Sequence, residues 1–172
     1  VLGKPIAGGI PAAVYGFSTP VTERIRKFLE TRAPGHSGIG TTLSGSKIQL
    51  ALMRAVLENY FTREAFAPLI ALAKKLEKGI ADVIIKHSVP WHVVRVGARV
   101  EFMCTPTRPR NGGEAAAVIH RPIDVALHHY LLNRGVIVTP FHNMMLICPS
   151  TTEAHVNRLV EGLDRCLAEL LS

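Results

Sequence analysis

Apolar residues recur at helical spacing in three long segments of the chain. In residues 46–60 they cover so much of the circumference that a mostly buried helix is expected. In residues 62–87 they lie along one side, with lysines and a glutamate opposite, which predicts a long helix covering another layer. A third amphipathic helix is expected to start at residues 150–153, where hydroxyl and acidic side chains favour a helix N-terminus.

Short segments of strand-like character lie between these helices. Residues 92–96 and 99–104 alternate branched and polar side chains around Gly97, which predicts two strands joined by a turn. Residues 136–139 and 144–148 form a second strand-like pair, joined by residues 140–143, and one helix is expected from Ile119 to Leu131. The second half is therefore predicted to be α+β, with helices packed on a short antiparallel sheet.

The first part of the chain has a different pattern. Residues 1–20 are rich in glycine and proline and predict a loop that runs into a short strand at Val14. Thr19 as a cap, Pro20 behind it and Glu23 in the first turn then predict a helix. Because the sequence offers no clear partner for the strand at Val14, residues 1–61 are interpreted as the edge of a larger domain.

Composition excludes several classes of protein. With 172 residues, 48% of them hydrophobic, the chain can bury an ordinary core and is not disordered. The longest apolar run, residues 65–73, is far shorter than the roughly 20 residues of a membrane span, so no membrane partner is expected. Three cysteines without a CxxC spacing favour a cytoplasmic location, and neighbouring His128 and His129 cannot face one metal ion, so no metal is expected.

The net charge of +7 would suit a nucleic-acid partner. The basic residues are scattered, however, and aromatic residues make up only 6% of the chain, so few rings are available to stack on bases. No nucleic-acid partner is expected. An anionic cofactor or an acidic protein partner could use the same positive surplus.

Two short segments contain residues that could take part in catalysis or ligand binding. Lys4 stands alone among small and apolar residues, a setting that desolvates an amine and favours its neutral, nucleophilic form. The alternative is an exposed lysine in a turn. Residues 41–46 are rich in hydroxyls and precede a helix, where side chains and backbone N–H groups can hold a phosphate. Simple helix capping is the alternative there.

Taken together, the two stretches resemble a known family. Lys-x-x-x-Gly-Gly at residues 4–9, followed about forty residues later by Thr-Leu-Ser-Gly at residues 42–45, resembles the class-III aminotransferases of pyridoxal-phosphate fold type I, most closely their glutamate-1-semialdehyde aminomutase-like branch. The resemblance extends over the whole chain, because residues 134–136 and the helix start at 151–153 are similar to the family's small C-terminal domain. It implies an α/β enzyme, of which residues 1–61 are the C-terminal edge of the large cofactor-binding domain and residues 62–172 the small domain.

The resemblance also implies roles for individual residues. Lys4 would form the internal Schiff base with pyridoxal 5′-phosphate and then shuttle a proton between the substrate and the cofactor. Thr42 would bind the cofactor phosphate, reaching across the interface of a homodimer into the partner's site. Ser44 and Gly45 would shape the turn that carries Thr42.

The implied activity is transfer of an amino group between an amino acid or amine donor and a keto-acid or aldehyde acceptor. An aminomutase or racemase uses the same lysine and stays open, as does a noncatalytic dimerisation or binding fragment. The family's cofactor-binding aspartate, stacking ring and phosphate loop precede the lysine, so a missing N-terminal half is expected and the chain alone is expected to be inactive. With its apolar helix at residues 46–60 uncovered, such a chain is also expected to self-associate.

Two further residues are candidates for substrate contacts. Residues 144–150 lack the arginine that many class-III enzymes acting on ω-amino acids place at this point to grip a carboxylate. Arg99 is the candidate replacement, and His142 is a candidate for lining a substrate channel, with ordinary surface positions as the alternatives. Cys104 and Cys148 are expected to be buried strand residues rather than nucleophiles.

Overall fold

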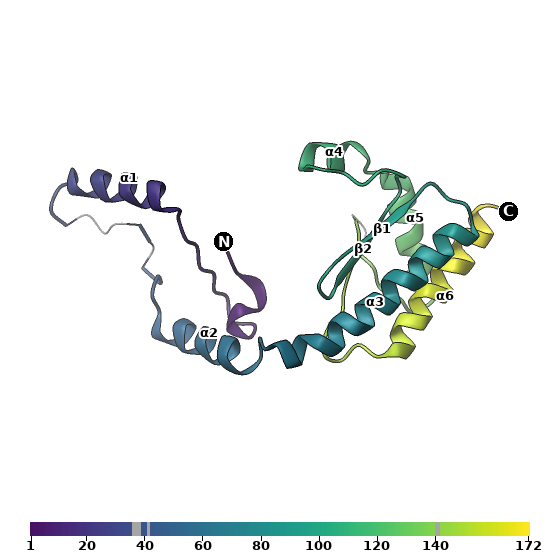
Figure 1. Cartoon of the computed structure of the whole chain (residues 1–172), viewed down its shortest axis with the longest axis horizontal. Helices are drawn as coiled ribbons and strands as arrows, with labels where there is room; N and C mark the ends of the chain where they lie inside the picture. The colour runs from purple at the N-terminus through teal and green to yellow at the C-terminus, as the bar shows by residue number, and fades with distance from the viewer. Residues whose placement is uncertain (36–38, 41, 140–141) are drawn as a thin grey trace. The chain divides into compact units, whose positions relative to one another are not determined.

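The chain forms two compact units, Val1–Arg63 and Glu64–Ser172 (Figure 1). The computed structural model describes residues 1–35, 39–40, 42–139 and 142–172. Thr41, from the hydroxyl-rich stretch, and residues 140–141, expected to join two strands, lie outside the described residues. Within the described part, every helix is too short or too polar to cross a bilayer.

The described part of the first unit contains a 3₁₀ helix and two α-helices. These are η1 (Lys4–Ala7), α1 (Thr19–Glu30) and α2 (Lys47–Asn59). The helix expected at residues 46–60 is thus present as α2. At the expected strand, the structure has a single bridge between Leu2 and Val14, with N–O distances of 2.8 and 2.7 Å.

The start of α1 differs in detail from the prediction. Ser18, not Thr19, is the N-cap residue, and Thr19 is the first residue of the helix. Pro20 lies in the first turn as expected, where its missing N–H costs nothing. Glu23 lies beyond the first turn, so the first turn carries no acidic side chain.

The first unit buries few apolar side chains. Its core consists of Ile6 and Ala7 from η1 and Met53 from α2, with Ala12 and Leu52 partly buried beside them. The prediction that α2 is mostly buried is therefore wrong for the chain on its own. Helix α2 carries apolar side chains around most of its circumference. In the described part of this unit only the η1 segment packs closely against it, so its other faces stay exposed.

The second unit is built on a three-stranded antiparallel sheet in the order β1-β2-β3. The strands are β1 (His92–Val96), β2 (Arg99–Met103) and β3 (Asn143–Leu146). Gly97, with φ 59°, takes the left-handed conformation that the tight β1–β2 turn needs. Side chains alternate between the faces, so that Val100 and Phe102 of β2 enter the core while Glu101 points to the opposite face.

In the residues that the structure describes, four helices accompany the sheet: α3 (Arg63–Lys86), α4 (Gly112–Ala117), α5 (Arg121–Leu132) and α6 (Glu153–Leu170). The helices expected at residues 62–87 and after residue 150 are confirmed. The helix expected from Ile119 to Leu131 starts later, because His120 caps α5 through its side chain and Pro122 lies in the first turn. Ile119 belongs to the turn that separates α5 from the short α4.

The strand expected at residues 136–139 is absent. Val136 N donates to Leu131 O at 2.9 Å, and Val138 O lies 2.6 Å from His128 Nδ1. Polar groups of this segment are therefore paired with α5 and not with a neighbouring strand. Alternating apolar side chains predicted a strand, but the local contacts with the preceding helix decide the conformation.

Helices α3 and α6 lie side by side and run in the same direction (Figure 1). Lys75 Nζ donates to Glu153 Oε2 at 2.7 Å near one end, and His87 Nε2 lies 2.7 Å from Asp164 Oδ1 near the other. Between these contacts Gly79 allows close approach, since a Cβ there would lie 2.7 Å from Val160 Cγ2.

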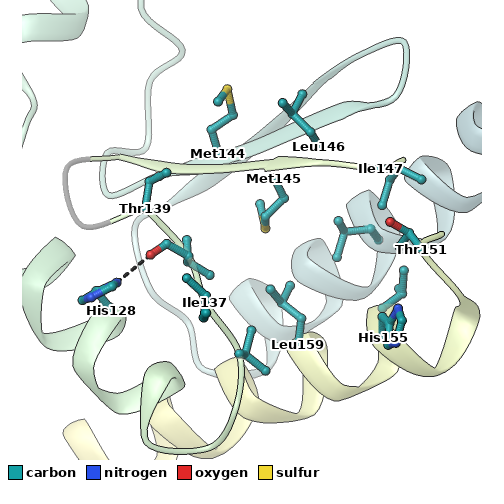
Figure 2. A pocket seen from close by; sticks show the side chains of 14 residues that line it. His128, Ile137, Thr139, Met144, Met145, Leu146, Ile147, Thr151, His155 and Leu159 are labelled. Atoms are coloured by element: carbon teal, nitrogen blue, oxygen red, sulfur yellow. Dashed lines mark hydrogen bonds between the residues drawn. The ribbon is translucent and has the colours of Figure 1, made fainter. Parts of the chain in front are cut away.

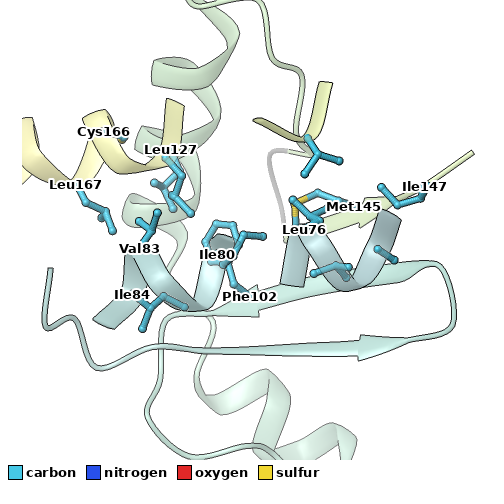
Figure 3. Packing of buried hydrophobic residues seen from close by; sticks show 14 residues of the cluster. Leu76, Ile80, Val83, Ile84, Phe102, Leu127, Met145, Ile147, Cys166 and Leu167 are labelled. Atoms are coloured by element: carbon cyan, nitrogen blue, oxygen red, sulfur yellow. The ribbon is translucent and has the colours of Figure 1, made fainter. Parts of the chain in front are cut away.

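The main core lies between α3, α5, α6 and the sheet (Figure 3). Phe102 is 2% exposed and stacks on Trp91 with ring centroids 5.8 Å apart. The buried residues of this core are Ala73, Leu76, Ile80, Val83, Ile84, Val100, Phe102, Leu127, Met145, Ile147, Val156, Leu163, Cys166 and Leu167. The second unit therefore has the α+β architecture expected from the sequence, helices packed on a short antiparallel sheet.

Candidate functional site

Lys4 is held in an unusual backbone conformation. Its φ of 58° lies in the left-handed region, which residues other than glycine seldom adopt. Before Lys4, Leu2 is bridged to Val14, and after it Ile6 and Ala7 are buried. Such strained positions cluster at functional sites. The Lys4 side chain is exposed, so the desolvation expected from the sequence is not provided by the chain on its own.

The two glycines after Lys4 close the segment against α2. Gly8 and Gly9 have φ values of 63° and 98°, and Gly8 N donates to Pro5 O at 3.0 Å to end η1. A Cβ at Gly8 would lie 3.4 Å from Val56 Cγ2, which shows how closely the turn approaches α2. The Lys-x-x-x-Gly-Gly motif therefore encodes a tight turn packed on a helix, with its amine at the surface.

The hydroxyl-rich turn leads directly into α2. Thr42, Ser44 and Gly45 are exposed, Gly45 has φ 74°, and Ser46 is the N-cap residue. Among the described residues, no side chain caps the helix, and its first turn contains no acidic group. The backbone N–H groups at this helix start and the nearby hydroxyls form a donor set suited to an anion such as a phosphate.

Part of this turn lines a cavity of about 600 Å³ in the first unit. Ser44 and Gly45 form one side, residues 11–15 another, and Gln49 joins them by donating from Nε2 to Pro11 O at 2.8 Å. Lys4 and Thr42 are not among its lining residues. Of the four predicted cofactor residues, the structure thus brings only Ser44 and Gly45 to one cavity.

The two predicted substrate residues meet at Glu101, which the sequence analysis missed. Arg99 Nη2 donates to Glu101 Oε2 at 2.6 Å, and His142 Nδ1 lies 3.4 Å from Glu101 Oε1. Because the Glu101 side chain is only 19% exposed, the carboxylate is a partly buried bridge between the two. The Arg-x-Glu spacing on one strand places Arg99 and Glu101 on the same face and could have indicated this pair.

A small cavity of about 40 Å³, lined by Glu101 and His142 among others, is large enough for a water molecule. Asp124, only 6% exposed, lines it and accepts a hydrogen bond from Asn143 Nδ2 at 3.0 Å. Burial, together with the Asp124 carboxylate, raises the pKa of Cys104 to about 12. Despite these titratable groups, no set of three or more His, Cys, Asp or Glu side chains in the described part is arranged to hold a metal ion.

Cys148 is exposed and follows β3, so the prediction of a buried strand residue is wrong. The strand ends at Leu146, and the chain then turns into α6. The hydroxyls of Ser150 and Thr151 lie 3.1 and 3.3 Å from Sγ, and hydrogen bonds from both residues lower the pKa of Cys148 to about 7. Cys104 is half-buried just after β2.

A cavity of about 430 Å³ in the second unit lies between residues 136–139, β3 and α6 (Figure 2). Met145 points into it from β3 towards α6, whereas Met144 and Leu146 point to the opposite face of the strand. Its two histidines are occupied, since His128 Nδ1 pairs with Val138 O and His155 Nδ1 accepts from Thr152 N. The cavity is therefore largely apolar, and none of the predicted site residues lines it.

Comparisons with known proteins point to one group of enzymes. No known protein-family profile matches the chain. A glutamate-1-semialdehyde 2,1-aminomutase of Macrococcus caseolyticus is 27% identical over 99% of the chain and 38% of its own length. Among solved structures, a lysine-to-alanine variant of a glutamate-1-semialdehyde-aminomutase from Pseudomonas aeruginosa in complex with PMP is 46% identical, with a TM-score of 0.86, over 98% of the chain.

A more distant structure shares the fold. A β-phenylalanine aminotransferase of Variovorax paradoxus is 21% identical, with a TM-score of 0.76, and the chain covers 37% of it. The chain thus spans less than two fifths of the length of these relatives. It corresponds over nearly its whole length to the C-terminal portion of a glutamate-1-semialdehyde-aminomutase-like class-III aminotransferase of fold type I.

Proposed function

We propose that this chain is the part of a pyridoxal-phosphate-dependent aminotransferase that carries the cofactor-binding lysine, Lys4. The observation that carries the proposal is the 46% identity, at a TM-score of 0.86, to a glutamate-1-semialdehyde-aminomutase. The reaction would transfer an amino group from an amino acid or amine to a keto acid or aldehyde. We further propose that residues 1–61 belong to the large domain of the enzyme and that it acts in the cytoplasm.

The residues present fit this cofactor. The amine of Lys4, exposed on a strained turn, is available to bind the cofactor's aldehyde carbon. Thr42, Ser44 and the N–H groups at the start of α2 are the donors that a phosphate needs. When bound, pyridoxal 5′-phosphate supplies an electron sink for the reacting substrate. Lys4 would then move a proton at the substrate α-carbon, a role that requires an amine.

We propose a homodimer as the working unit. Thr42 is exposed on its own chain, as a residue that serves a partner's site must be. Exposed apolar side chains on the neighbouring α2, such as Ile48 and Leu57, favour a covering partner. The net charge of +7 suits an anionic cofactor at such a site.

For the substrate we propose contacts to His142 and Arg99. Arg99 is already paired with Glu101, so a substrate carboxylate at Arg99 would have to compete with a partly buried carboxylate. His142, only half-exposed beside the same carboxylate, is held in place for a polar contact.

The second candidate is an aminomutase. The 27% identical relative carries that name, as does the 46% identical structure. An aminomutase moves the amino group within one molecule and needs no separate acceptor, whereas a transaminase needs a keto acid or aldehyde. A racemase that uses the same lysine and a noncatalytic dimerisation or binding fragment are the remaining alternatives.

An activity assay with and without an acceptor tests the proposal. The chain, expressed together with any sequence that precedes it, is assayed with pyridoxal 5′-phosphate, amino donors and keto acids, and separately with glutamate-1-semialdehyde alone. Lys4→Ala is expected to lose activity by at least about a thousandfold, because the proton at the substrate has no other carrier. Lys27→Ala, which removes an exposed lysine of the same unit, is expected to retain it.

The outcomes separate the candidates. Turnover that depends on a keto acid supports the transaminase, and turnover of the semialdehyde alone supports the aminomutase. Full activity of Lys4→Ala would contradict the role of Lys4. Binding of the cofactor without any turnover would favour the noncatalytic alternative.

A further inference from the structure

Three arginines surround a concave surface of about 360 Å³ on the second unit. Arg134 comes from the turn after α5, and Arg158 and Arg165 come from α6. Glu161 and the buried Gly162 complete the lining. None of the residues proposed for amino transfer contributes to this surface.

Arg158 is fixed on the backbone of the neighbouring turn. Its Nε and Nη2 donate to Arg134 O at 3.2 and 2.7 Å. Gly135, with φ 75°, makes room for the guanidinium, because a Cβ at that position would overlap Arg158 Nη2. In the described part of the chain Nη1 has no protein partner, so the fixed guanidinium keeps N–H donors for a ligand.

Arg134 is also held in place. Its guanidinium carbon lies 3.4 Å from the centroid of the Tyr130 ring, and its Nη2 lies 3.3 Å from Glu169 Oε1. Tyr130 in turn donates its hydroxyl to Glu169 at 2.5 Å. Two of the three guanidinium groups are therefore ordered before any ligand arrives, which reduces the entropic cost of binding.

Arg165 and Glu161 lie one turn of α6 apart. Within the described residues, neither side chain has a hydrogen bond or an ion pair. Gly162, between them on the helix, has no side chain, and a Cβ there would come within 3.0 Å of Leu131 Cδ2. The surface thus combines two ordered guanidinium groups, a third that is unpaired, and one unpaired carboxylate.

We propose that this surface binds a phosphate group that still carries a proton, as inorganic phosphate does near neutral pH. Guanidinium groups recognise phosphate oxygens through paired N–H donors. Glu161 would repel a fully deprotonated anion but can accept a hydrogen bond from the P–OH of hydrogen phosphate. Sulfate has no proton at this pH, so the carboxylate makes the site selective for phosphate over sulfate.

The competing explanation is structural: Arg158 would serve only to satisfy the carbonyl at the end of α5. The two explanations differ at Arg165, which has no partner to lose in the part of the chain that the structure describes. Replacing Arg165 should change ligand binding without changing stability. Arg121 offers a matched control, because it is an exposed arginine of the same unit outside this surface.

The test is titration of the full chain with inorganic phosphate and with sulfate, at pH 7.5 and constant ionic strength. Saturable phosphate binding is expected, weakened about tenfold or more in Arg165→Gln because a charge-assisted hydrogen bond is lost. Arg121→Gln is expected to bind as the unaltered chain does, and thermal unfolding should show that Arg165→Gln remains folded. Absence of saturable binding, or equal loss in both variants, would overturn the proposal.

Glu161→Gln tests the selectivity. The unaltered chain is expected to prefer phosphate over sulfate at least about fivefold, because only phosphate can donate to the carboxylate. In Glu161→Gln, sulfate binding should strengthen and the preference should disappear. Equal affinity for both anions in the unaltered chain would show that the surface is only a positively charged region without selectivity, and would overturn the phosphate assignment.

Discussion

The two units of the chain contain similar apolar helices but bury them very differently. In the second unit, α3 places Leu76 and Ile80 in a core formed with the sheet, α5 and α6. In the first unit, α2 buries only Met53, while Ile48 is 70% exposed. Apolar spacing shows which residues avoid water, but burial requires other layers. The first unit has few such layers in its described part, which is why we expect it to depend on a partner.

The largest expected effect is the destabilisation of the second unit by Phe102→Ala. Removing this 2% exposed ring leaves a cavity beside Trp91 and should lower the free energy of unfolding by about 3–5 kcal/mol. Urea unfolding followed by the fluorescence of Trp91, the only tryptophan of the chain, measures it. Ile85→Ala, at a 73% exposed position, should cost less than about 0.5 kcal/mol.

The same transition tests the contrast between the units. Met53→Ala alters the small core of the first unit and should leave the Trp91 transition within about 0.5 kcal/mol of the unaltered chain. A change of several kcal/mol in the free energy of this transition would show that the stability of the second unit depends on the first, which would contradict the contrast between the units.

The cysteines provide the next largest effect. With its pKa lowered to about 7, Cys148 is about half thiolate at pH 7, and its alkylation by iodoacetamide should rise as pH increases from 6 to 8. Cys104 and Cys166, whose pKa values are raised to about 12 and about 11 by burial, should stay protonated over this range. We expect Cys148 to react at least about fiftyfold faster than either, measured by peptide mass spectrometry.

Two controls sharpen the thiol experiment. Ser150→Ala removes the first contributor to the lowered pKa and should move the pH midpoint of Cys148 alkylation upwards. Cys166, fully buried in the core, should become reactive only at the urea concentration that unfolds the second unit. Rapid labelling of Cys166 in the absence of urea would contradict a closed core.

The smallest expected effect is at the contact between α3 and α6. Gly79→Ala gains helix propensity but forces a Cβ against the stiff Val160 side chain, so we expect a net loss of about 1–2 kcal/mol. Combining it with Val160→Ala should remove that added cost. Gly112→Ala, where a Cβ meets nothing within 4 Å, should change stability by less than about 0.5 kcal/mol; a similar loss there would rule out the steric explanation.

Periodicity predicted most helices because their side chains repeat over many residues. Residues 62–87 and the helix after residue 150 follow this rule, as does the β1–β2 hairpin around Gly97. Residues 136–139 do not follow it. Four alternating residues cannot reveal that the backbone carbonyl of Val138 pairs with His128, ten residues away along the chain. Short segments depend on partners that the local pattern does not contain.

The candidate site shows the same limit. Lys4 and Thr42 could be proposed from the sequence because each lies in a short motif. Asp124 could not, and Glu101 could be paired only with Arg99 of its own strand, because their other partners, Asn143 and His142, come from a distant segment of the chain. Sequence also could not show that Lys4, which closely follows the bridge between Leu2 and Val14, has a φ of 58°.

The most direct test of the proposed function is to find which lysine holds the cofactor. The chain, together with any sequence that precedes it, is incubated with pyridoxal 5′-phosphate, reduced with borohydride to make the attachment permanent, and mapped by peptide mass spectrometry. The label is expected on Lys4 alone and should be absent from Lys4→Ala. Label spread over exposed lysines such as Lys27, or none at all, would contradict the assignment of Lys4.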